Sequence, residues 1–332
     1  MNKIIITGGL GFIGSEAIRQ SVYRGFEVLN IDAKKYSANT YNIHSVKSSP
    51  QYKFVKLDLL DKEKLQEVIL EYAPDAILHF AAESHVDNSI NNPLEFIKSN
   101  IEGTFNLLEG AKNYFYLKKK SINNFNFIHI STDEVFGSLG DNGIFNEKTC
   151  YDPQSPYSAS KASSDHLVRA WHNTYELPIK ITNCSNNYGP YQHSEKFIPV
   201  IIRNAIRNEN IPLYGSGKNI RDWLHVSDHV NAIFEVLTKG KNGETYLIGG
   251  NNEISNIDLA RKICQIIDKK MPFKHSRERL IRMVEDRKGH DYRYAIDNSK
   301  IKNNIGWKPK IKFQQGITNT IDWYIENYKK YL

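Results

Sequence analysis

The fold of this chain is decided by its first turn, Thr7-Gly8-Gly9-Leu10-Gly11-Phe12-Ile13-Gly14. The turn follows a β-branched apolar run at Lys3–Thr7 and opens a helical pattern at Phe12–Arg24. In the spacing GxxGxxG, the first glycine permits a tight turn, the second lets the backbone approach a pyrophosphate and the third lets the helix pack against the strand. Free N–H groups and the helix dipole then favour an anion. The stretch predicts a dinucleotide-binding turn.

An acidic residue follows at the spacing that such a turn requires. Asp32 ends the second predicted strand, Glu27–Ile31, eighteen residues beyond Gly14. A carboxylate at this place can accept both adenosine ribose hydroxyls and repels a 2′-phosphate, which favours NAD over NADP. Lys34 and Lys35 lie beside it and would suit a phosphate, so NADP remains the alternative cofactor.

Apolar strand-like runs alternate with helical patterns through the first half of the chain, which predicts a parallel sheet covered by helices on both faces. Further strands are expected at Phe54–Leu59, Ala76–Ala81, Phe125–Ser131 and Ile179–Asn183, and further helices at Lys62–Tyr72, Pro93–Tyr116 and Pro156–Tyr175. Later segments are expected as strands at Pro212–Tyr214 and Glu244–Ile248 and as helices at Ile198–Arg207, Ser227–Thr238, Asn256–Asp268 and Gln315–Tyr328.

The predicted fold class is therefore α/β, a Rossmann-type doubly wound parallel sheet followed by a smaller C-terminal α/β substrate domain. We expect residues 1–185 to form the NAD-binding domain, with some later segments returning to it, and residues 186–332 to bind the substrate.

Composition excludes several classes of protein. The 332 residues are 40% hydrophobic and 24% charged, without an apolar run long enough to span a membrane and without a readable secretion signal. The three cysteines, Cys150, Cys184 and Cys264, are scattered, which predicts no metal site and a reducing cytoplasm. The net charge is +7, but Lys118-Lys119-Lys120 is the only dense basic run. A solvated basic surface suited to an anionic substrate is therefore favoured over a nucleic-acid site.

A tyrosine and a lysine supply candidate redox chemistry. Tyr157 and Lys161 form the pattern YxxxK at the start of a predicted helix, where a spacing of four places both side chains on one face. An ammonium beside a phenol lowers its pKa, so Tyr157 is predicted to take a proton from a substrate hydroxyl while a hydride leaves the same carbon. Lys161 is also expected to hold the nicotinamide ribose.

With the glycine turn and the acidic strand end, this pattern resembles the extended short-chain dehydrogenase/reductase superfamily. The resemblance implies a glycine-loop Rossmann domain joined to a nucleotide-sugar domain. It also implies a homodimer, in which the helices Pro93–Tyr116 and Pro156–Tyr175 pair across a two-fold axis. Five aromatic residues on these helices look exposed, with packing on the sheet as the alternative: Phe105, Tyr114, Phe115, Trp171 and Tyr175.

A polar triplet at the end of the fifth predicted strand selects the reaction. Thr132 supplies a hydroxyl donor, and the adjacent carboxyl groups of Asp133 and Glu134 lie at the sheet edge where ligands bind. Different surroundings could keep Asp133 protonated while Glu134 stays ionised, which would place an acid beside a base.

Thr-Asp-Glu resembles the dTDP-glucose and UDP-glucose 4,6-dehydratases, whereas related GDP-mannose dehydratases carry Thr-Ser-Glu and the epimerases have no acid–base pair. Further stretches agree with this family at residues 81–90, 183–199, 220–226 and 286–290, and the dTDP-glucose enzymes match best. A UDP-glucose 4,6-dehydratase, a 4-epimerase and a non-catalytic NAD-sensing or RNA-binding protein remain as alternatives.

The resemblance implies an internal redox cycle on dTDP-glucose that yields a 4-keto-6-deoxy sugar and water. In it, Tyr157 deprotonates the 4-hydroxyl, Glu134 removes the C5 proton, Asp133 protonates the departing 6-hydroxyl and Thr132 binds O4. The chain departs from the family pattern at Ser99, Phe136, Ser194 and Lys288, which leaves every reacting group in place.

Two sets of contact residues are expected. The cofactor set contains Gly8, Gly11, Phe12, Ile13, Gly14, Asp32, Lys34, Asp58, Leu59, Phe80, Ala81, Ala82, Ser99, Tyr157, Lys161 and Asn187. The substrate set contains Ser84, His85, Thr132, Asn186, Glu195, Lys196, Phe197, Pro212, Tyr214, Arg221, Asn252, Arg287 and His290.

Overall fold

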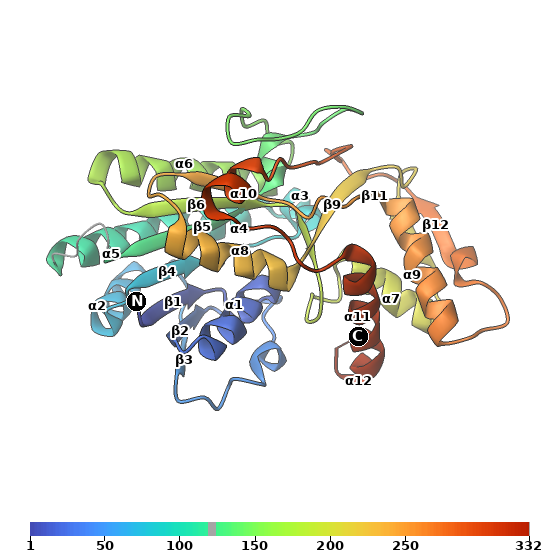
Figure 1. The fold of residues 1–332 in the computed structure, drawn as a ribbon, viewed down its shortest axis with the longest axis horizontal. Helices are drawn as coiled ribbons and strands as arrows, with labels where there is room; N and C mark the ends of the chain where they lie inside the picture. Colours follow the sequence, from blue (N-terminus) through green and yellow to red (C-terminus); the bar gives the residue numbers. More distant parts are fainter. Residues whose placement is uncertain (119–123, 332) are drawn as a thin grey trace.

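A parallel sheet forms the larger part of the protein (Figure 1). The structure is a computed structural model that describes residues 1–118 and 124–331, so Lys119 and Lys120 of the basic run lie outside the described residues. The sheet has seven strands in the order β10-β6-β5-β4-β1-β2-β3, and every neighbouring pair is parallel. The strands are β1 (Lys3–Thr7), β2 (Glu27–Asp32), β3 (Tyr52–Lys56), β4 (Ala76–His79), β5 (Asn126–Thr132), β6 (Ile179–Cys184) and β10 (Thr245–Ile248).

Helices cover both faces of this sheet, as the alternating pattern predicted. Because successive strand residues point to opposite faces, Ile4 and Ile6 belong to one core cluster and Ile5 to the other. The first face is covered by α1 (Phe12–Tyr23), α8 (Val226–Lys239) and α10 (Ser299–Ile305). The second face is covered by α2 (Lys62–Tyr72), α5 (Gly103–Leu117) and α6 (Pro156–Tyr175). The doubly wound fold is confirmed.

The chain reverses its winding direction between β1 and β4, which are neighbours in the sheet. The strands β2 and β3 extend to one side of this pair, and β5 and β6 extend to the other. In open α/β sheets, ligands bind outside the carboxyl ends of the strands at such a switch point. The topology therefore places a binding crevice beyond Thr7 and His79.

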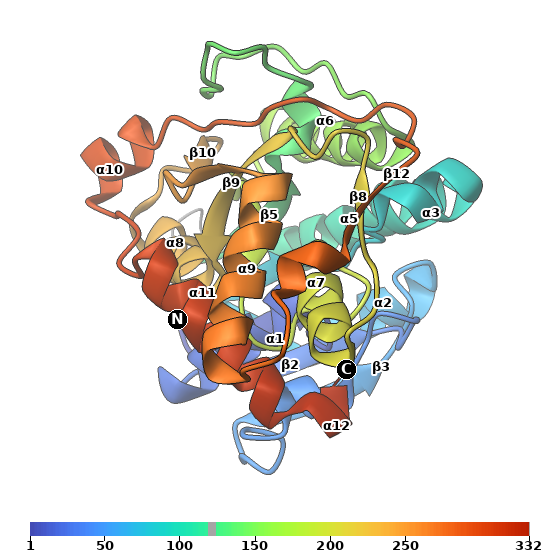
Figure 2. The same cartoon turned by 90° about the vertical axis from the view of Figure 1, so that its right-hand side faces the viewer.

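The second part of the chain forms a smaller unit with its own apolar core, and this unit lies in front of the large sheet in Figure 2. Its helices are α7 (Phe197–Arg207), α9 (Asn256–Lys270), α11 (Phe313–Glu326) and α12 (Tyr328–Tyr331). Its strands are β7 (Asn186–Tyr188), β8 (Ile211–Tyr214), β9 (Ile220–His225), β11 (Glu253–Ser255) and β12 (Ile281–Val284). Because β10, α8 and α10 join the large sheet instead, segments after residue 185 return to it. A domain boundary at residue 185 stays a prediction.

Helix α6 begins where its sequence requires. Ser155 caps it, with its hydroxyl accepting from the N–H of Ser158 while the Ser158 hydroxyl accepts from the N–H of Ser155. Pro156 occupies the first turn, where its missing N–H costs no hydrogen bond. This fixed start places Tyr157 in the first turn of the helix and Lys161 one turn later.

The predicted long helix Pro93–Tyr116 is interrupted. It consists of α4 (Pro93–Phe96), a π-helical segment at Ile97–Glu102 and α5, and it follows the short helix α3 (Val86–Asn91). The π-helical turn brings Asn100 inward, where its amide accepts from Glu83 N at 2.8 Å and donates to Glu83 O at 3.0 Å. A single helical period could not reveal this insertion. Short 3₁₀ segments lie at Thr40–Ile43, Asp133–Phe136 and Arg277–Leu280.

The expectation that five aromatic residues of these helices are exposed is partly wrong. Tyr114 and Phe115 are buried in the core beneath α5. Trp171 stacks edge-on against both Phe105 and Tyr175, so these rings are partly covered by contacts within and between α5 and α6. The packing alternative therefore holds for Tyr114 and Phe115.

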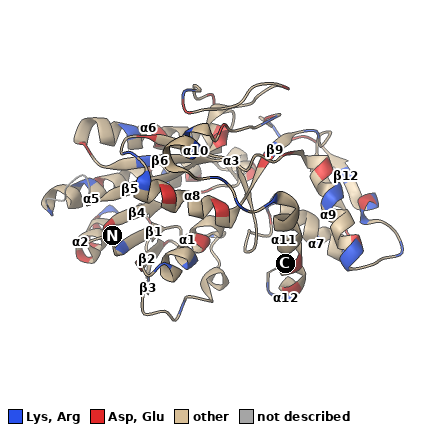
Figure 3. Ribbon diagram, viewed as in Figure 1, with Lys and Arg blue, Asp and Glu red and all other residues tan. Residues whose placement is uncertain are grey.

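Charged side chains are spread over both parts of the molecule (Figure 3). Basic and acidic side chains occur in both parts, so the positive net charge does not come from one basic helix. In the two described ranges, no helix is both long and apolar enough to cross a lipid bilayer.

Candidate active site

A cavity lies at the carboxyl edge of the sheet, across the switch point between β1 and β4. Most of the residues that the sequence singled out line it. They are Gly8, Gly11, Phe12, Ile13, Gly14, Asp32, Asp58, Leu59, Phe80, Ala81, Ala82, Ser84, Ser99, Thr132, Asp133, Glu134, Tyr157, Lys161, Asn186, Asn187, Glu195 and Lys196. The structure does not bring the remaining residues to its wall, which are Lys34, His85, Phe197, Pro212, Tyr214, Arg221, Asn252, Arg287 and His290.

Gly8, Gly11 and Gly14 of the first turn differ in what a Cβ atom at their positions would meet. Gly8 has φ of +70°, and a Cβ there would lie 2.7 Å from the Ala81 backbone. A Cβ on Gly14 would lie 2.3 Å from the Gly8 carbonyl oxygen. A Cβ on Gly11 would lie 3.3 Å from that same oxygen, and Gly11 lines the cavity. The turn therefore presents bare backbone to a ligand, as a pyrophosphate site requires.

Asp32 closes the adjacent end of the cavity. Its carboxylate accepts from the backbone N–H of Leu10 at 2.9 Å and of Lys34 at 2.8 Å. These bonds fix the carboxylate beside the glycine turn. The Lys34 ammonium instead lies 4.9 Å from the centre of the Phe54 ring, while Lys35 lines the cavity and lies 3.7 Å from Asp58. The predicted cofactor contact of Lys34 stays a prediction, and Lys35 is the lysine of the pair that lines the cavity.

Asp133 and Glu134 stand at the end of β5 in unlike surroundings. Asp133 is 2% exposed, and burial followed by the neighbouring Glu134 carboxylate raises its pKa well above the usual range. Burial also raises the pKa of Glu134, but the guanidinium groups of Arg287 and Arg221 oppose the rise. The Thr132 hydroxyl donates to Asp133 Oδ1 at 3.3 Å and accepts from Glu134 N at 3.2 Å. The environment thus favours a neutral Asp133 beside a more readily ionised Glu134.

Tyr157 departs from its sequence prediction. Burial, and then the carboxyl group of Glu134, raise the pKa of its phenol well above the ordinary value. The Lys161 ammonium donates a hydrogen bond to the Ile130 carbonyl at 2.9 Å. The net direction is opposite to the lowering expected from Lys161, so that expectation is wrong for the protein without bound cofactor.

Several predicted substrate residues gather in a second cluster, beside the cavity. The Tyr214 hydroxyl donates to Asp87 Oδ2 at 3.3 Å, and Arg287 Nη1 lies 4.0 Å from the other oxygen of Asp87. The His290 ring packs edge-on against Tyr214, and its Nδ1 lies 2.6 Å from Asp286 Oδ1. Lys196 links this side to the cavity wall by donating to the Ser84 carbonyl at 2.9 Å.

Arg221 and Asn252 are engaged elsewhere. Arg221 is 5% exposed, and its guanidinium donates to the carbonyls of Asp291 and Tyr292 at 2.8 and 3.2 Å. Its charge still reaches the acid–base pair, because it opposes the rise in pKa of both carboxyl groups. Asn252 is held by Asp222, which accepts from its backbone N–H at 2.6 Å. The expected contacts of Arg221 and Asn252 with the substrate stay predictions.

Comparisons with known proteins agree with this geometry. The family model described as GDP-mannose 4,6 dehydratase matches residues 5–320. The chain is 50% identical over 326 residues to the dTDP-glucose 4,6-dehydratase of Xanthomonas campestris pv. campestris, strain B100, covering 97% of this chain and 93% of that protein. The chain belongs to the dTDP-glucose 4,6-dehydratase family.

Solved structures of this family superpose closely on the protein. The dTDP-glucose 4,6-dehydratase of Streptomyces venezuelae, crystallised with NAD, has a TM-score of 0.91 at 40% identity, and the match covers 98% of both chains. The Bacillus anthracis dTDP-glucose 4,6-dehydratase, also in complex with NAD, has a TM-score of 0.88 at 43% identity, and the match covers 100% of this chain and 99% of that one.

The departures from the dTDP-glucose 4,6-dehydratase pattern are accommodated locally. Phe136 is buried between the rings of Phe145 and Tyr151, at centroid distances of 5.2 and 5.1 Å, so this position packs without a hydroxyl. The Ser194 carbonyl accepts from Arg203 at 3.2 Å, which ties the substrate loop to α7. Nothing in the structure explains Lys288.

The cavity also contains residues that the sequence analysis missed. These are Ile31, Ala33, Lys35, Ser37, Ala38, Leu57, Glu83, Ile130, Ser131, Cys184, Ser185, Gln192 and His193. Most are immediate neighbours of predicted residues, and extending each motif by one or two positions would have found them. Ser37 and Ala38 carried no such signal, because they belong to the loop after β2 that folds back over the crevice.

Proposed function

We propose that this chain converts dTDP-glucose to dTDP-4-keto-6-deoxyglucose and water. The observation that carries the proposal is the meeting of two systems in one cavity: the adjacent carboxyl groups of Asp133 and Glu134, and the pair Tyr157 and Lys161. A dehydrogenase or epimerase needs the second pair alone. Removal of water next to a ketone also needs an acid and a base, and these lie side by side here with pKa values moved by different surroundings.

The cavity fits NAD. The bare backbone of the glycine turn suits a pyrophosphate, and the fixed carboxylate of Asp32 suits the hydroxyls of an adenosine ribose. Tyr157 and Lys161 line the same cavity as Asp32 and would lie at the nicotinamide end. When bound, NAD supplies reversible hydride acceptance and the positive charge that the phenol of Tyr157 lacks in the protein alone.

The side chains divide the proton transfers among them. Tyr157 takes the proton of the 4-hydroxyl as C4 is oxidised, and Thr132 donates a hydrogen bond to O4. The new ketone acidifies the C5–H bond, and Glu134, whose ionised form is favoured by two arginines, removes that proton. Asp133, held neutral by burial, gives its proton to the departing 6-hydroxyl. The hydride removed from C4 is finally returned to C6, and a proton is restored at C5, so the sugar undergoes no net oxidation.

The test is incubation of purified protein with dTDP-glucose and no added NAD. The cycle leaves the cofactor unchanged, so product with the alkali-induced ultraviolet absorbance of a 4-keto sugar should form. UDP-glucose in competition measures the preference for the nucleotide. Formation of dTDP-galactose would refute the dehydratase in favour of an epimerase, and a strong preference for UDP-glucose would refute the assigned substrate.

We also propose that the protein is a cytoplasmic homodimer that pairs through α5 and α6. Tyr116 and Leu117 at the end of α5 are 53% and 67% exposed, which leaves apolar surface at this end of the helix pair. All three cysteines are free thiols, as expected in a reducing compartment. Light scattering during gel filtration should give twice the 38.3 kDa mass of the chain, and Leu117→Glu should shift the mass towards the monomer.

A further inference from the structure

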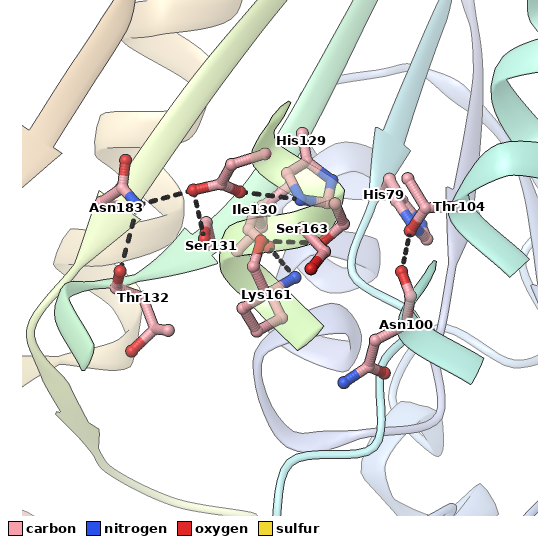
Figure 4. A network of polar contacts seen from close by, with 12 residues as sticks. His79, Asn100, Thr104, His129, Ile130, Ser131, Thr132, Lys161, Ser163 and Asn183 are labelled. Atoms are coloured by element: carbon pink, nitrogen blue, oxygen red, sulfur yellow. Dashed lines mark hydrogen bonds and ion pairs between the residues drawn. The ribbon is translucent and has the colours of Figure 1, made fainter. Parts of the chain in front are cut away.

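A network of buried polar groups adjoins the cavity through Ser131 and Lys161, which line it (Figure 4). At its centre is Asp165, which is 0% exposed and lies one helical turn after Lys161 on α6. Asp165 Oδ2 accepts from the hydroxyls of Ser131 at 2.9 Å and Tyr151 at 2.8 Å, and from the amide of Asn183 at 3.1 Å. Oδ1 lies 3.2 Å from His129 Nε2. The proposed reaction gives none of these groups a role.

His79 and His129, the two histidines of this network, are neutral. Burial lowers the pKa of His129 to about 4 and that of His79 well below its usual range, and the positive charge of Lys161 contributes in both cases. Thr104 gives its own proton to the Asn100 carbonyl at 2.6 Å, so it accepts from His79 Nε2 at 2.9 Å. Uncharged histidines cannot balance a buried carboxylate.

Asp165 is nevertheless ionised. Burial would raise its pKa, but His129, whose Nε2 lies 3.2 Å away, is the largest influence that lowers it, and the charge of Lys161 and the hydroxyl of Tyr151 lower it further, so that together they outweigh burial. Lys161 is 4% exposed, and burial lowers the pKa of its ammonium while Asp165 is the largest influence that opposes this. Within residues 1–118 and 124–331, no carboxylate forms a direct ion pair with Lys161. The two charges therefore stabilise each other across one turn of helix, where water does not screen them.

The position of Asp165 is fixed from several sides. Asn183 on β6 donates to Asp165 and also to the Thr132 carbonyl at 3.0 Å, so the carboxylate is tied to the strand end that carries the acid–base pair. Tyr151 donates to Asp165 and accepts from Arg169 at 2.7 Å, which anchors the other side. The charge thus cannot move away from Lys161 without breaking several buried hydrogen bonds.

We propose that Asp165 is a positioning residue that acts through Lys161 and keeps its ammonium charged beside Tyr157 throughout the catalytic cycle. This inference rests on the proposed function. It predicts that removal of the negative charge, and not of one hydrogen bond, changes the pH range in which the protein works. Because activity needs the ammonium form of Lys161, loss of Asp165 lets that proton leave at lower pH.

The test compares Asp165→Asn with Tyr151→Phe. The first variant removes the charge at nearly constant shape, whereas the second removes one hydrogen bond to the same oxygen and keeps the charge. For Asp165→Asn, the alkaline limb of the kcat–pH profile should move down by about one pH unit or more. For Tyr151→Phe, the limb should stay in place. KM for the nucleotide sugar should change by less than about twofold in both, because neither side chain lines the cavity.

Equal alkaline limbs in the two variants would overturn the inference, since hydrogen bonding alone would then explain any loss of activity. If Asp165→Asn does not fold, Asp165→Glu against Asp165→Gln repeats the comparison of charge at matched volume. Failure of both uncharged variants to fold would assign Asp165 a structural role and also overturn the inference. Absence of 4-keto product from the unmodified protein would instead refute the proposed function.

Discussion

Replacement of Asp133 by asparagine should separate the two halves of the reaction. Asp133 is buried and its pKa is raised well above the usual range, so asparagine copies the shape of the neutral acid but cannot transfer its proton. A general acid typically contributes ~10²–10⁴-fold, so loss of water should slow by that factor, equivalent to about 3–5 kcal/mol of transition-state free energy. Oxidation at C4 should continue, because it depends on Tyr157.

The assay is a rapid quench with borodeuteride, which counts nucleotide sugar that has a 4-ketone but retains its 6-hydroxyl. This species should accumulate in Asp133→Asn and not in the unmodified protein. A carboxyl group with a raised folded pKa loses its contribution to stability as pH rises through that pKa, so the variant should resist alkaline unfolding at least as well as the unmodified protein. Equal slowing of C4 oxidation and water loss would refute the division of roles.

Two further predictions follow from the geometry. Arg287→Met removes the largest influence that lowers the pKa of Glu134, so the acid limb of the kcat–pH profile should move to higher pH. If that limb does not move, Arg287 does not control the pKa of Glu134. Gly14→Ala places a methyl group 2.3 Å from the Gly8 carbonyl oxygen, and should cost about 1–3 kcal/mol of unfolding free energy and release the cofactor. Gly140→Ala, which meets nothing within 4 Å, is the control for thermal unfolding and for bound cofactor, and similar losses in both variants would contradict the steric argument.

The sequence predicted most of the large sheet because local signals and packing agree there. Helix α2 occupies Lys62–Tyr72, the predicted bounds, since Asp61 caps its start and Ala73 ends it in a left-handed conformation. The third strand was predicted two residues late, at Phe54–Leu59. Its pairing with β2 starts at Tyr52 opposite Val28, and such register depends on a partner strand that local alternation does not show.

Strand β9 escaped prediction because its sequence, Ile220–His225, contains two adjacent charged residues. Arg221 and Asp222 are 5% and 1% exposed, and backbone hydrogen bonds satisfy both. A charged pair normally indicates a solvated turn, and only the tertiary fold supplies the carbonyl and N–H groups that make burial possible.

The candidate site was predictable where chemistry follows from neighbours in sequence, as for Gly8, Gly11, Gly14 and the pair Asp133 and Glu134. It was not predictable where distant segments meet. The contacts of Tyr214 with Asp87 and His290 join three segments of the chain, and the Asp165 network joins two strands and a helix. The direction of the Tyr157 pKa was also missed, because it follows from burial and from the carboxyl group of Glu134, which the pattern YxxxK does not show.

The central claim is that the hydride removed from C4 returns to the same sugar at C6. Purified protein without added cofactor should convert dTDP-glucose carrying deuterium at C4 into a 4-keto-6-deoxy product with deuterium at C6, as detected by mass spectrometry and NMR. Mixing labelled with unlabelled substrate should leave the label in the molecule that supplied it. Product without deuterium at C6, or label exchanged between substrate molecules, would contradict the account.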